Sequence, residues 1–211
     1  MKKILALILT AVLCLTCIAA LAEEDVPEGA KLVKPIPVEL DLNNIPDGEY
    51  IAEFDPEELK DNEIPLTIYA VDHYADADIK GLAVGDYILI DDEALKIESV
   101  DTDEYGDVQI NGGLVEDGYD LTVWDGDTDW TVAGLDDYPT WTALGDVTLP
   151  IDDDVNLIDG VNGDDNPLTA QGAQEVVKAI TSSEEDYFDE YNTTVTVKSG
   201  KVVTIHRVYN P

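Results

Sequence analysis

The sequence predicts a mostly β, β-rich α+β fold: an antiparallel sandwich or small barrel of short hairpins, with one C-terminal helix and a closing β-hairpin. Three observations predict it. Short segments of alternating apolar and polar residues recur along most of the chain, and turn signals such as Asp-Gly, Asn-Gly-Gly and Ser-Gly separate them. A single long segment near the C-terminus changes to a helical period. Short, evenly spaced strands of this kind are typical of sandwiches and small barrels.

The N-terminus has the pattern of a secretory signal peptide. Lys2 and Lys3 precede an apolar run that ends in Ala20-Leu21-Ala22, and two glutamates follow at once. A basic start, an apolar centre and a small-x-small end favour cleavage, with a membrane anchor as the alternative. We therefore expect residues 1–22 to be removed and the protein to be secreted or cell-wall associated in a bacterium.

Composition narrows the chemistry of the mature chain. Both cysteines, Cys14 and Cys17, lie in the signal segment, so disulfides, zinc-thiolate sites and thiol nucleophiles are not expected. That segment also holds two of the 11 basic residues and none of the 47 acidic ones, which leaves a formal charge of 9 minus 47, or −38. Such a charge argues against nucleic acid and anionic membrane surfaces as partners. It favours cations, glycans or basic extracellular proteins.

The mature chain divides into three predicted parts. Residues 23–46 are Pro-rich, acidic and without periodicity, which indicates an extended spacer. A β-rich domain is expected over residues 47–158, beginning at the turn pair Asp47-Gly48. Residues 159–211 are expected to form a polar loop, a helix and a closing hairpin that pack on the same domain.

Local patterns place the elements along the chain. Asp55-Pro56 favours one turn of helix after the first strand, because Asp caps a helix and Pro fits its first position. Residues 75–82 suggest a second short helix. The strands are expected at residues 49–54, 65–74, 84–90, 94–100, 108–110, 119–124, 130–133, 141–151 and 155–158.

The C-terminal part changes its period and then returns to alternation. A helix is expected from Thr169 to about Phe188, with Ala173, Val177, Ile180 and Tyr187 on one face. Residues 193–197 and 201–208 then form a hairpin around Ser199-Gly200. We expect this hairpin to join the sheet and the helix to cover one open end or face of it.

Two acidic loops are candidate calcium sites. Asp125, Asp127 and Asp129 alternate like calcium ligands, but Trp130 stands where an EF-hand needs its bend glycine. Asn162 and Asp164 lie in a segment that resembles the calcium loop of dockerin modules, without its bend glycine or closing acid. We interpret both as ordinary polar turns. No cofactor is therefore expected, and Ca²⁺ is the alternative.

Four aromatic residues suggest a carbohydrate site. Trp124, Trp130, Tyr138 and Trp141 are close in sequence, and exposed rings of this kind stack on sugars. The alternative is core packing, since tryptophan carries much of the packing energy of small domains. We expect Trp124 and Trp130 to be near-neighbours across a hairpin, with at least one facing inward.

The sequence contains no catalytic motif. His73 and His206 are the only histidines, and no P-loop, dinucleotide-binding or zinc-protease pattern is present. Glycoside hydrolysis by a pair of carboxylates stays an open alternative, because the 47 acidic residues allow many such pairs. The leading prediction is a non-enzymatic binding or interaction protein. A calcium-assisted carbohydrate-binding module and a carboxylate-pair glycoside hydrolase are the alternatives.

Two patches carry a family resemblance. "DGEYIAEF" and "NTTVTVKSGKVVTIHRV" resemble the strand pattern of FMN-binding domains of bacterial envelope redox proteins. The Gly-Ala-Thr stretch where those families attach the flavin is missing, so no flavin residue is assigned. As a whole, the chain is similar to uncharacterised acidic secreted proteins of anaerobic Gram-positive bacteria, a resemblance that implies no activity.

Overall fold

The fold is mostly β, as the sequence predicts. The computed structural model describes residues 26–60, 62–124, 127–134, 138–163, 165–182 and 188–208. The predicted signal peptide, residues 1–22, lies outside the described residues. Within those ranges, no helix is both long and apolar enough to cross a membrane.

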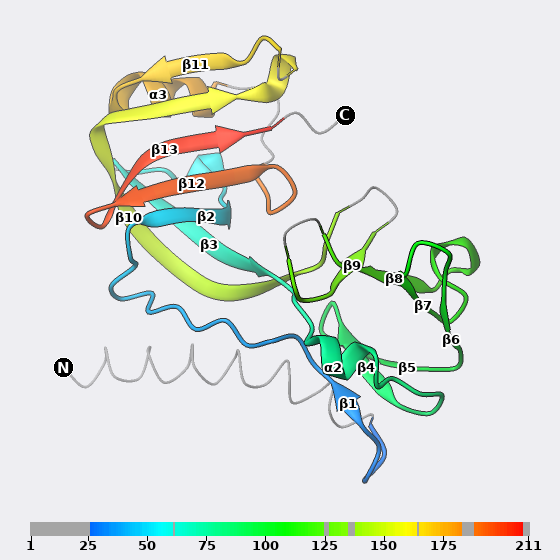
Figure 1. Cartoon of the computed structure of the whole chain (residues 1–211). Helices are drawn as coiled ribbons and strands as arrows, with labels where there is room; N and C mark the ends of the chain where they lie inside the picture. The colour runs from blue at the N-terminus through cyan, green and yellow to red at the C-terminus, as the bar shows by residue number, and fades with distance from the viewer. Residues whose placement is uncertain are drawn as a thin grey trace, which may run out of the picture. The chain divides into compact units, whose positions relative to one another are not determined.

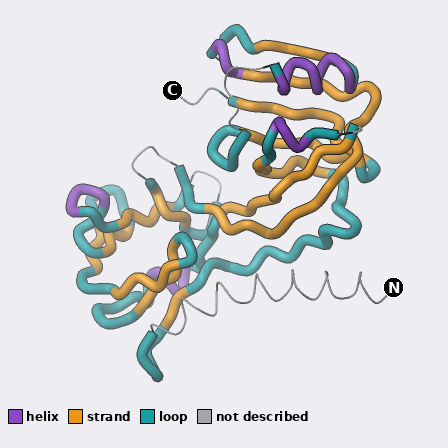
Figure 2. The backbone as a smooth tube through the Cα atoms, turned by 180° about the vertical axis from the view of Figure 1, so that it is seen from behind, coloured by secondary structure: helices purple, strands orange, loops and turns teal. Residues whose placement is uncertain are grey.

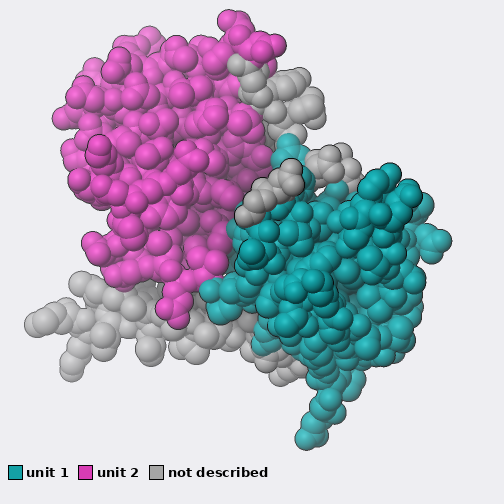
Figure 3. All heavy atoms as spheres, in the orientation of Figure 1, with its two compact units in different colours: residues 1–37, 71–142 teal, residues 38–70, 143–211 magenta. Residues whose placement is uncertain are grey.

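The chain forms two compact units, coloured separately in Figure 3. Unit 1 consists of Val71–Thr142 and the described residues up to Pro37, and unit 2 of Val38–Ala70 and Ala143–Pro211. Each unit has its own apolar core. The β-rich segment expected to form one domain over residues 47–158 is thus divided between two units.

Five strands of unit 2 close into a small barrel (Figure 1). The strand order is β11-β10-β13-β12-β2-β3, and β3 also pairs with β10, which closes the ring. Alternation places one side of each strand in the barrel core, as in Ile64, Leu66 and Ile68. The strands are β2 (Gly48–Glu53), β3 (Glu63–Val71), β10 (Trp141–Asp159), β11 (Leu168–Gln171), β12 (Thr193–Lys198) and β13 (Lys201–Arg207).

The barrel is not entirely antiparallel. β10 pairs with β13 in parallel, whereas the other pairs with recorded registers in unit 2 are antiparallel. A parallel pair needs a long crossover connection. Here β11, a helix and β12 supply it, and this relationship between distant segments leaves no local sequence signal.

β10 is one long strand, not the two strands expected at residues 141–151 and 155–158. Asp152 to Asp154 lie between the two expected segments and belong to the strand. The pairing with β13 shifts register between Ile151 and Asn156, as at a β-bulge. A bulge absorbs extra residues without ending the strand.

The C-terminal helix is shorter than predicted. Residues 169–171, expected in its first turn, belong to the edge strand β11 on β10, and α3 covers only Ala173–Thr181. Gly172, with φ +87°, separates the two elements. α3 buries Ala173, Val176 and Ile180 and lies beside β11 (Figures 1 and 2). Tyr187, the last residue of the predicted helical face, is outside the described ranges.

Unit 1 contains two small sheets and the short helix α2 (Asp76–Ile79). The order is β1-β4-β5 in one sheet and β6-β7-β8-β9 in the other. Their core contains Tyr74, Ile88, Ile110 and Leu121. The strands are β1 (Leu32–Val33), β4 (Tyr87–Ile90), β5 (Glu93–Lys96), β6 (Val100–Thr102), β7 (Val108–Ile110), β8 (Tyr119–Thr122) and β9 (Thr131–Ala133).

The described part of the predicted spacer, residues 26–46, contributes side chains to the cores of both units. Val33 belongs to β1 and is buried in the core of unit 1. Ile45 is buried in the core of unit 2, and Leu40 and Leu42 pack against that core. The proline-rich stretch still carries enough aliphatic side chains to be anchored by apolar burial.

Candidate functional site

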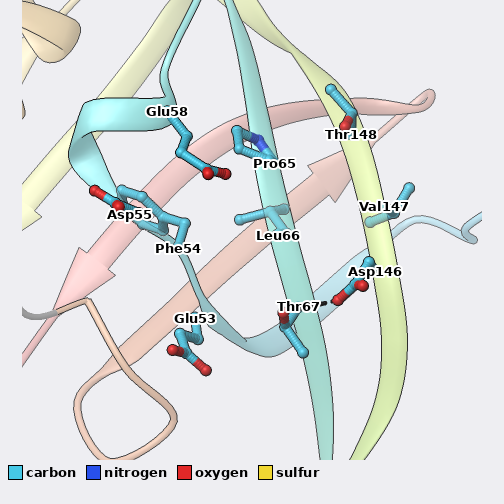
Figure 4. A pocket seen from close by; sticks show the side chains of 10 residues that line it. All are labelled: Glu53, Phe54, Asp55, Glu58, Pro65, Leu66, Thr67, Asp146, Val147 and Thr148. Atoms are coloured by element: carbon cyan, nitrogen blue, oxygen red, sulfur yellow. Dashed lines mark hydrogen bonds between the residues drawn. The ribbon is translucent and has the colours of Figure 1, made fainter. Parts of the chain in front are cut away.

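A pocket of about 410 Å³ lies on unit 2. Its walls come from the end of β2 with the single-turn helix η1 (Pro56–Glu58), from β3, and from the first half of β10. The lining residues are Glu53, Phe54, Asp55, Glu58, Pro65, Leu66, Thr67, Asp146, Val147 and Thr148 (Figure 4). Two of its three walls are neighbouring strands of the closed barrel, which limits how far the lining can move.

Two apolar residues behind the pocket are buried and well supported. Phe54 and Leu66 belong to the core of unit 2, with 5% and 2% of their surface exposed. Phe54 stacks on Phe188 with ring centroids 4.5 Å apart, and its backbone N–H donates to the Phe188 carbonyl at 2.9 Å. Phe54 is therefore held by both its backbone and its ring.

The stack continues to a buried ion pair. The guanidinium carbon of Arg207 lies 4.1 Å from the ring centroid of Phe188, a cation–π contact. Arg207 also forms two hydrogen bonds to Asp159, and both side chains are buried. Phe54, Phe188, Arg207 and Asp159 thus form a continuous series of contacts that ends at the pocket.

Four carboxylates line the pocket, and two of them are oriented by hydroxyl groups. Figure 4 shows Glu53, Asp55 and Glu58 on one side of β3 and Asp146 on the other. Thr67 donates to Asp146 at 2.9 Å, and the Tyr69 hydroxyl donates to Glu53 at 2.5 Å. None of the ten lining residues is basic.

Tyr69 keeps its proton at any ordinary pH. Burial, followed by the hydrogen bond to Glu53 and the nearby carboxylates, raises the pKa of Tyr69 far above its usual value of 10.0. Tyr69 is therefore a permanent donor to Glu53. The pocket offers hydrogen-bond acceptors, two of them oriented by neighbouring hydroxyl groups, and Thr67 and Thr148 are the only hydroxyl residues of its lining.

The predicted aromatic platform is not a single surface. Trp130 is 6% exposed and belongs to the core of unit 1, where its indole N–H donates to Asp76 at 3.0 Å. Trp124 is 41% exposed, and its indole N–H donates to Thr131 at 2.7 Å. One tryptophan of the pair thus faces inward, and Trp130 cannot offer a ring face to a sugar.

The structure does bring together the other two aromatic candidates. Tyr138 and Trp141 have ring centroids 6.2 Å apart with an interplanar angle of 43°. Both side chains are half-buried. Tilted, partly covered rings offer less flat area than a stacking platform for a sugar needs.

The predicted calcium ligands are only partly described. Asp125 and Asp164 lie outside the described residues. Asp127 and Asn162 are exposed and Asp129 is half-buried. Within the described ranges, no three His, Cys, Asp or Glu side chains are grouped so that they could hold a metal ion.

A buried carboxyl group in unit 1 was not singled out from the sequence. Asp72 is 4% exposed and accepts a hydrogen bond of 2.6 Å from the Thr142 hydroxyl. Burial raises the pKa of Asp72, and the nearby charge of Asp92 raises it further. Asp91, in the same turn as Asp92, also has a raised pKa because of burial and the charge of Asp72. One carboxylate among 47 acidic residues gives no sequence signal of its burial.

Comparisons with protein-family models, curated proteins and solved structures found no match to this chain. The functional argument therefore rests on the geometry of the chain itself.

Proposed function

We propose that the protein is a secreted or cell-surface, non-enzymatic binding protein and that the pocket of unit 2 is its ligand site. The pocket itself carries this proposal. Its volume of about 410 Å³ falls in the range of small-molecule sites, and its lining gathers carboxylate and hydroxyl groups from three segments of the chain.

The site is preorganised for binding. Phe54 is fixed by Phe188, Glu53 by Tyr69 and Asp146 by Thr67. Groups already held in place lose little conformational entropy when a ligand arrives, so more of the contact energy appears as affinity. The secreted location rests on the signal-like N-terminal sequence.

A carboxylate-pair glycoside hydrolase is the second candidate. One observation favours it, the presence of Glu53, Asp55, Glu58 and Asp146 around one pocket. Hydrolysis would require two carboxyl groups about 5–10 Å apart on opposite sides of the scissile bond. Release of reducing sugar from a glycan panel, lost in Asp146→Asn, would establish this reaction in place of simple binding.

The binding proposal is tested by filling the pocket. Thr148 is an exposed residue of β10 in the lining, and Thr148→Trp places a large ring at this site. Asn156→Trp is the matched control, because Asn156 is also exposed on β10 but does not line the pocket. A panel of amines, amino acids, amino sugars and neutral sugars is screened against the three proteins by ¹H–¹⁵N NMR.

We expect shifts at the lining residues with the wild-type chain and Asn156→Trp, and their loss with Thr148→Trp. A ligand that binds all three proteins equally would place the site elsewhere. Loss of its binding in Tyr138→Ala or Trp141→Ala would then support the carbohydrate-binding alternative.

A further inference from the structure

We infer that one outer face of the unit 2 barrel binds an uncharged polysaccharide. The face is formed by eight side chains on β11, β10, β13 and β12, which lie side by side in that order (Figure 1). None of the eight residues lines the pocket of unit 2. The inference therefore concerns a second site and goes beyond the proposed function.

The strand registers place these side chains in two rows on one side of the sheet. Residues that are directly paired on neighbouring strands project to the same side. The residues between the two rows, such as Leu157 and its partner Ile205, are buried in the barrel core, so the two rows project outward. The first row is Thr169, Ile158, His206 and Thr194, and the second is Gln171, Asn156, Thr204 and Thr196. We call these eight residues the carboxylate-free face.

The lack of acidic side chains on this face is unusual for a chain with 47 acidic residues. Strands in general prefer threonine to acidic residues, but that preference would act on every strand of the chain. Exposed acidic residues do occur on other strands: Glu49 and Glu53 on β2, Glu93 on β5, Asp101 on β6 and Asp146 on β10. Solubility is served by carboxylates on any surface. The composition of the face therefore indicates contact with a ligand that carboxylates would disturb.

Seven of the eight side chains are polar, and the fold does not use their hydrogen-bonding capacity. Threonine hydroxyls and Asn or Gln amides both donate and accept, whereas an ionised carboxylate only accepts. Within the described parts of the chain, no side-chain hydrogen bond involves any of these seven residues. Sugar hydroxyls also donate and accept, so a glycan matches this set of groups better than an ion does.

The charges around the face select an uncharged ligand. Glu49 is paired with Thr196, and Asp154 precedes Asn156 by two residues on β10, so an anionic polymer would be repelled at two edges. A cationic partner would find no counter-charge on the face itself and many carboxylates elsewhere.

The size of the face favours a polymer. Four strands, with three spacings of about 4.8 Å, make it about 14 Å wide, which is wider than one sugar ring. Ile158, with 38% of its surface exposed, adds an apolar contact for the C–H groups of a sugar ring. A polysaccharide lying across the strands can use both rows at once.

The experiment is affinity electrophoresis of the full chain in native gels that contain laminarin, galactomannan or xyloglucan, with polygalacturonate as the anionic comparison. The variant Asn156→Asp/Gln171→Glu adds two charges to the face with little change in size. Its matched control, Asn43→Asp/Asn44→Asp, adds two charges at exposed residues before β2. Each mobility is divided by that in a gel without polysaccharide, which cancels the effect of the added charges.

We expect retardation by at least one neutral polysaccharide and none by polygalacturonate. The face variant should weaken the apparent affinity by about tenfold or more, through the loss of amide donors and the burial of unpaired carboxylates, and the control variant by less than about twofold. No retardation by any neutral polysaccharide, equal weakening by both variants, or retardation by polygalacturonate would overturn the inference. The comparison of neutral with anionic polymers uses only the wild-type chain, so it holds even if a variant fails to fold.

Two further measurements assign the site. His206→Ala, at the centre of the first row, should also weaken binding, whereas His73→Ala, a change of the only other histidine, in unit 1, should not. All three tryptophans lie in unit 1, so a shift of Trp fluorescence on binding that disappears in Trp124→Ala would move the site to unit 1 and refute the face. Concentration-dependent dimers in analytical ultracentrifugation, abolished by the face variant and without retardation by any polysaccharide, would assign the face to a second copy of the chain instead.

Discussion

Arg207, the only arginine of the chain, pairs with Asp159 through two hydrogen bonds of 2.8 Å, from Nε to Oδ1 and from Nη2 to Oδ2. Both side chains are buried, with 3% and 1% of their surface exposed. Paired geometry of this kind is what compensates for removing two charges from water.

Removing one partner of this pair should strongly destabilise unit 2. Arg207→Met leaves Asp159 buried without its counter-ion, and we expect a loss of about 3–5 kcal/mol in the free energy of unfolding. Arg207→Met/Asp159→Leu should recover much of that loss. Lys201→Gln is the control, because Lys201 and Asp152 form a partly exposed pair worth at most about 1 kcal/mol. Urea denaturation followed by far-UV circular dichroism measures all four proteins, and an Arg207→Met loss no larger than that of Lys201→Gln would contradict the prediction.

The two tryptophans of the β8–β9 hairpin should behave very differently. Trp130→Ala removes a buried ring from the core of unit 1 and should cost about 3–5 kcal/mol. Trp124→Ala removes an exposed ring and should cost about 1 kcal/mol or less. All three tryptophans lie in unit 1, so denaturation followed by Trp fluorescence reports this unit. Similar losses of stability for the two variants would contradict the buried position of Trp130.

Unit 1 should lose stability as the pH rises through the pKa of folded Asp72. Below the ordinary value of 3.8, Asp72 is protonated in both states and its contribution is fully present. Above that value the unfolded chain releases the proton first, because burial raises the pKa of Asp72 in the folded unit. The free energy of unfolding then falls until the folded state is also ionised.

Asp72→Asn should therefore flatten the fall in stability above the ordinary pKa of 3.8, since it removes this difference in bound protons. Asp101→Asn, a change at an exposed residue of β6, accounts for the general effect of losing one negative charge. Urea denaturation with Trp fluorescence at several pH values gives the slopes. The same slope in both variants would mean that Asp72 is not the group responsible.

The β4–β5 turn is a site where substitution should stabilise the chain. Asp91 and Asp92, with φ +49° and +61°, join two strands whose register is closed by Ile90 and Glu93. A two-residue turn with both φ values positive prefers Asn-Gly. We expect Asp91→Asn/Asp92→Gly to gain about 1 kcal/mol at neutral pH, by relieving the backbone and removing charges near Asp72.

The β12–β13 turn supplies the comparison for that variant. Its residues, Ser199 and Gly200, also have positive φ, and glycine already occupies the second place. Ser199→Asn should therefore change stability by only a few tenths of a kcal/mol. A gain in this turn as large as in the β4–β5 turn would contradict the explanation by backbone relief and loss of charge near Asp72.

Calcium should have no specific effect on thermal stability. Trp130 stands where an EF-hand loop needs its bend glycine, so we expect Ca²⁺ and Mg²⁺ at about 5 mM to raise Tm equally, by screening the negative charge. Scanning calorimetry measures both. A larger shift with Ca²⁺ that disappears in Asp127→Asn/Asp129→Asn would restore the calcium alternative for that loop.

Much of the secondary structure follows from the sequence because its causes are local. Alternation predicts β2 and β3, the Asp55-Pro56 cap predicts η1, and Ser199-Gly200 predicts the closing hairpin. The helix predicted over residues 169–188 begins later in the chain, at Ala173, because Leu168–Gln171 pairs with the edge of β10 instead. The apolar periodicity of one segment does not show that a distant strand offers a free edge for pairing.

The pocket could not be predicted from the sequence. Phe54, Leu66 and Asp146 come from three separate segments, and the acidic residues of the lining look like the many others in the chain. A period of two tells that a strand has two faces, but not which face is buried or which strand lies beside it.

The sequence by itself therefore determined the mostly β class and the positions of many turns, since backbone preference and alternation act within a few residues. Tertiary structure alone decided the closure of the barrel through β3 and β10, the inward orientation of Trp130 and the meeting of Arg207 with Asp159. These depend on which distant segments bury apolar surface together, a choice made by the free energy of the whole unit.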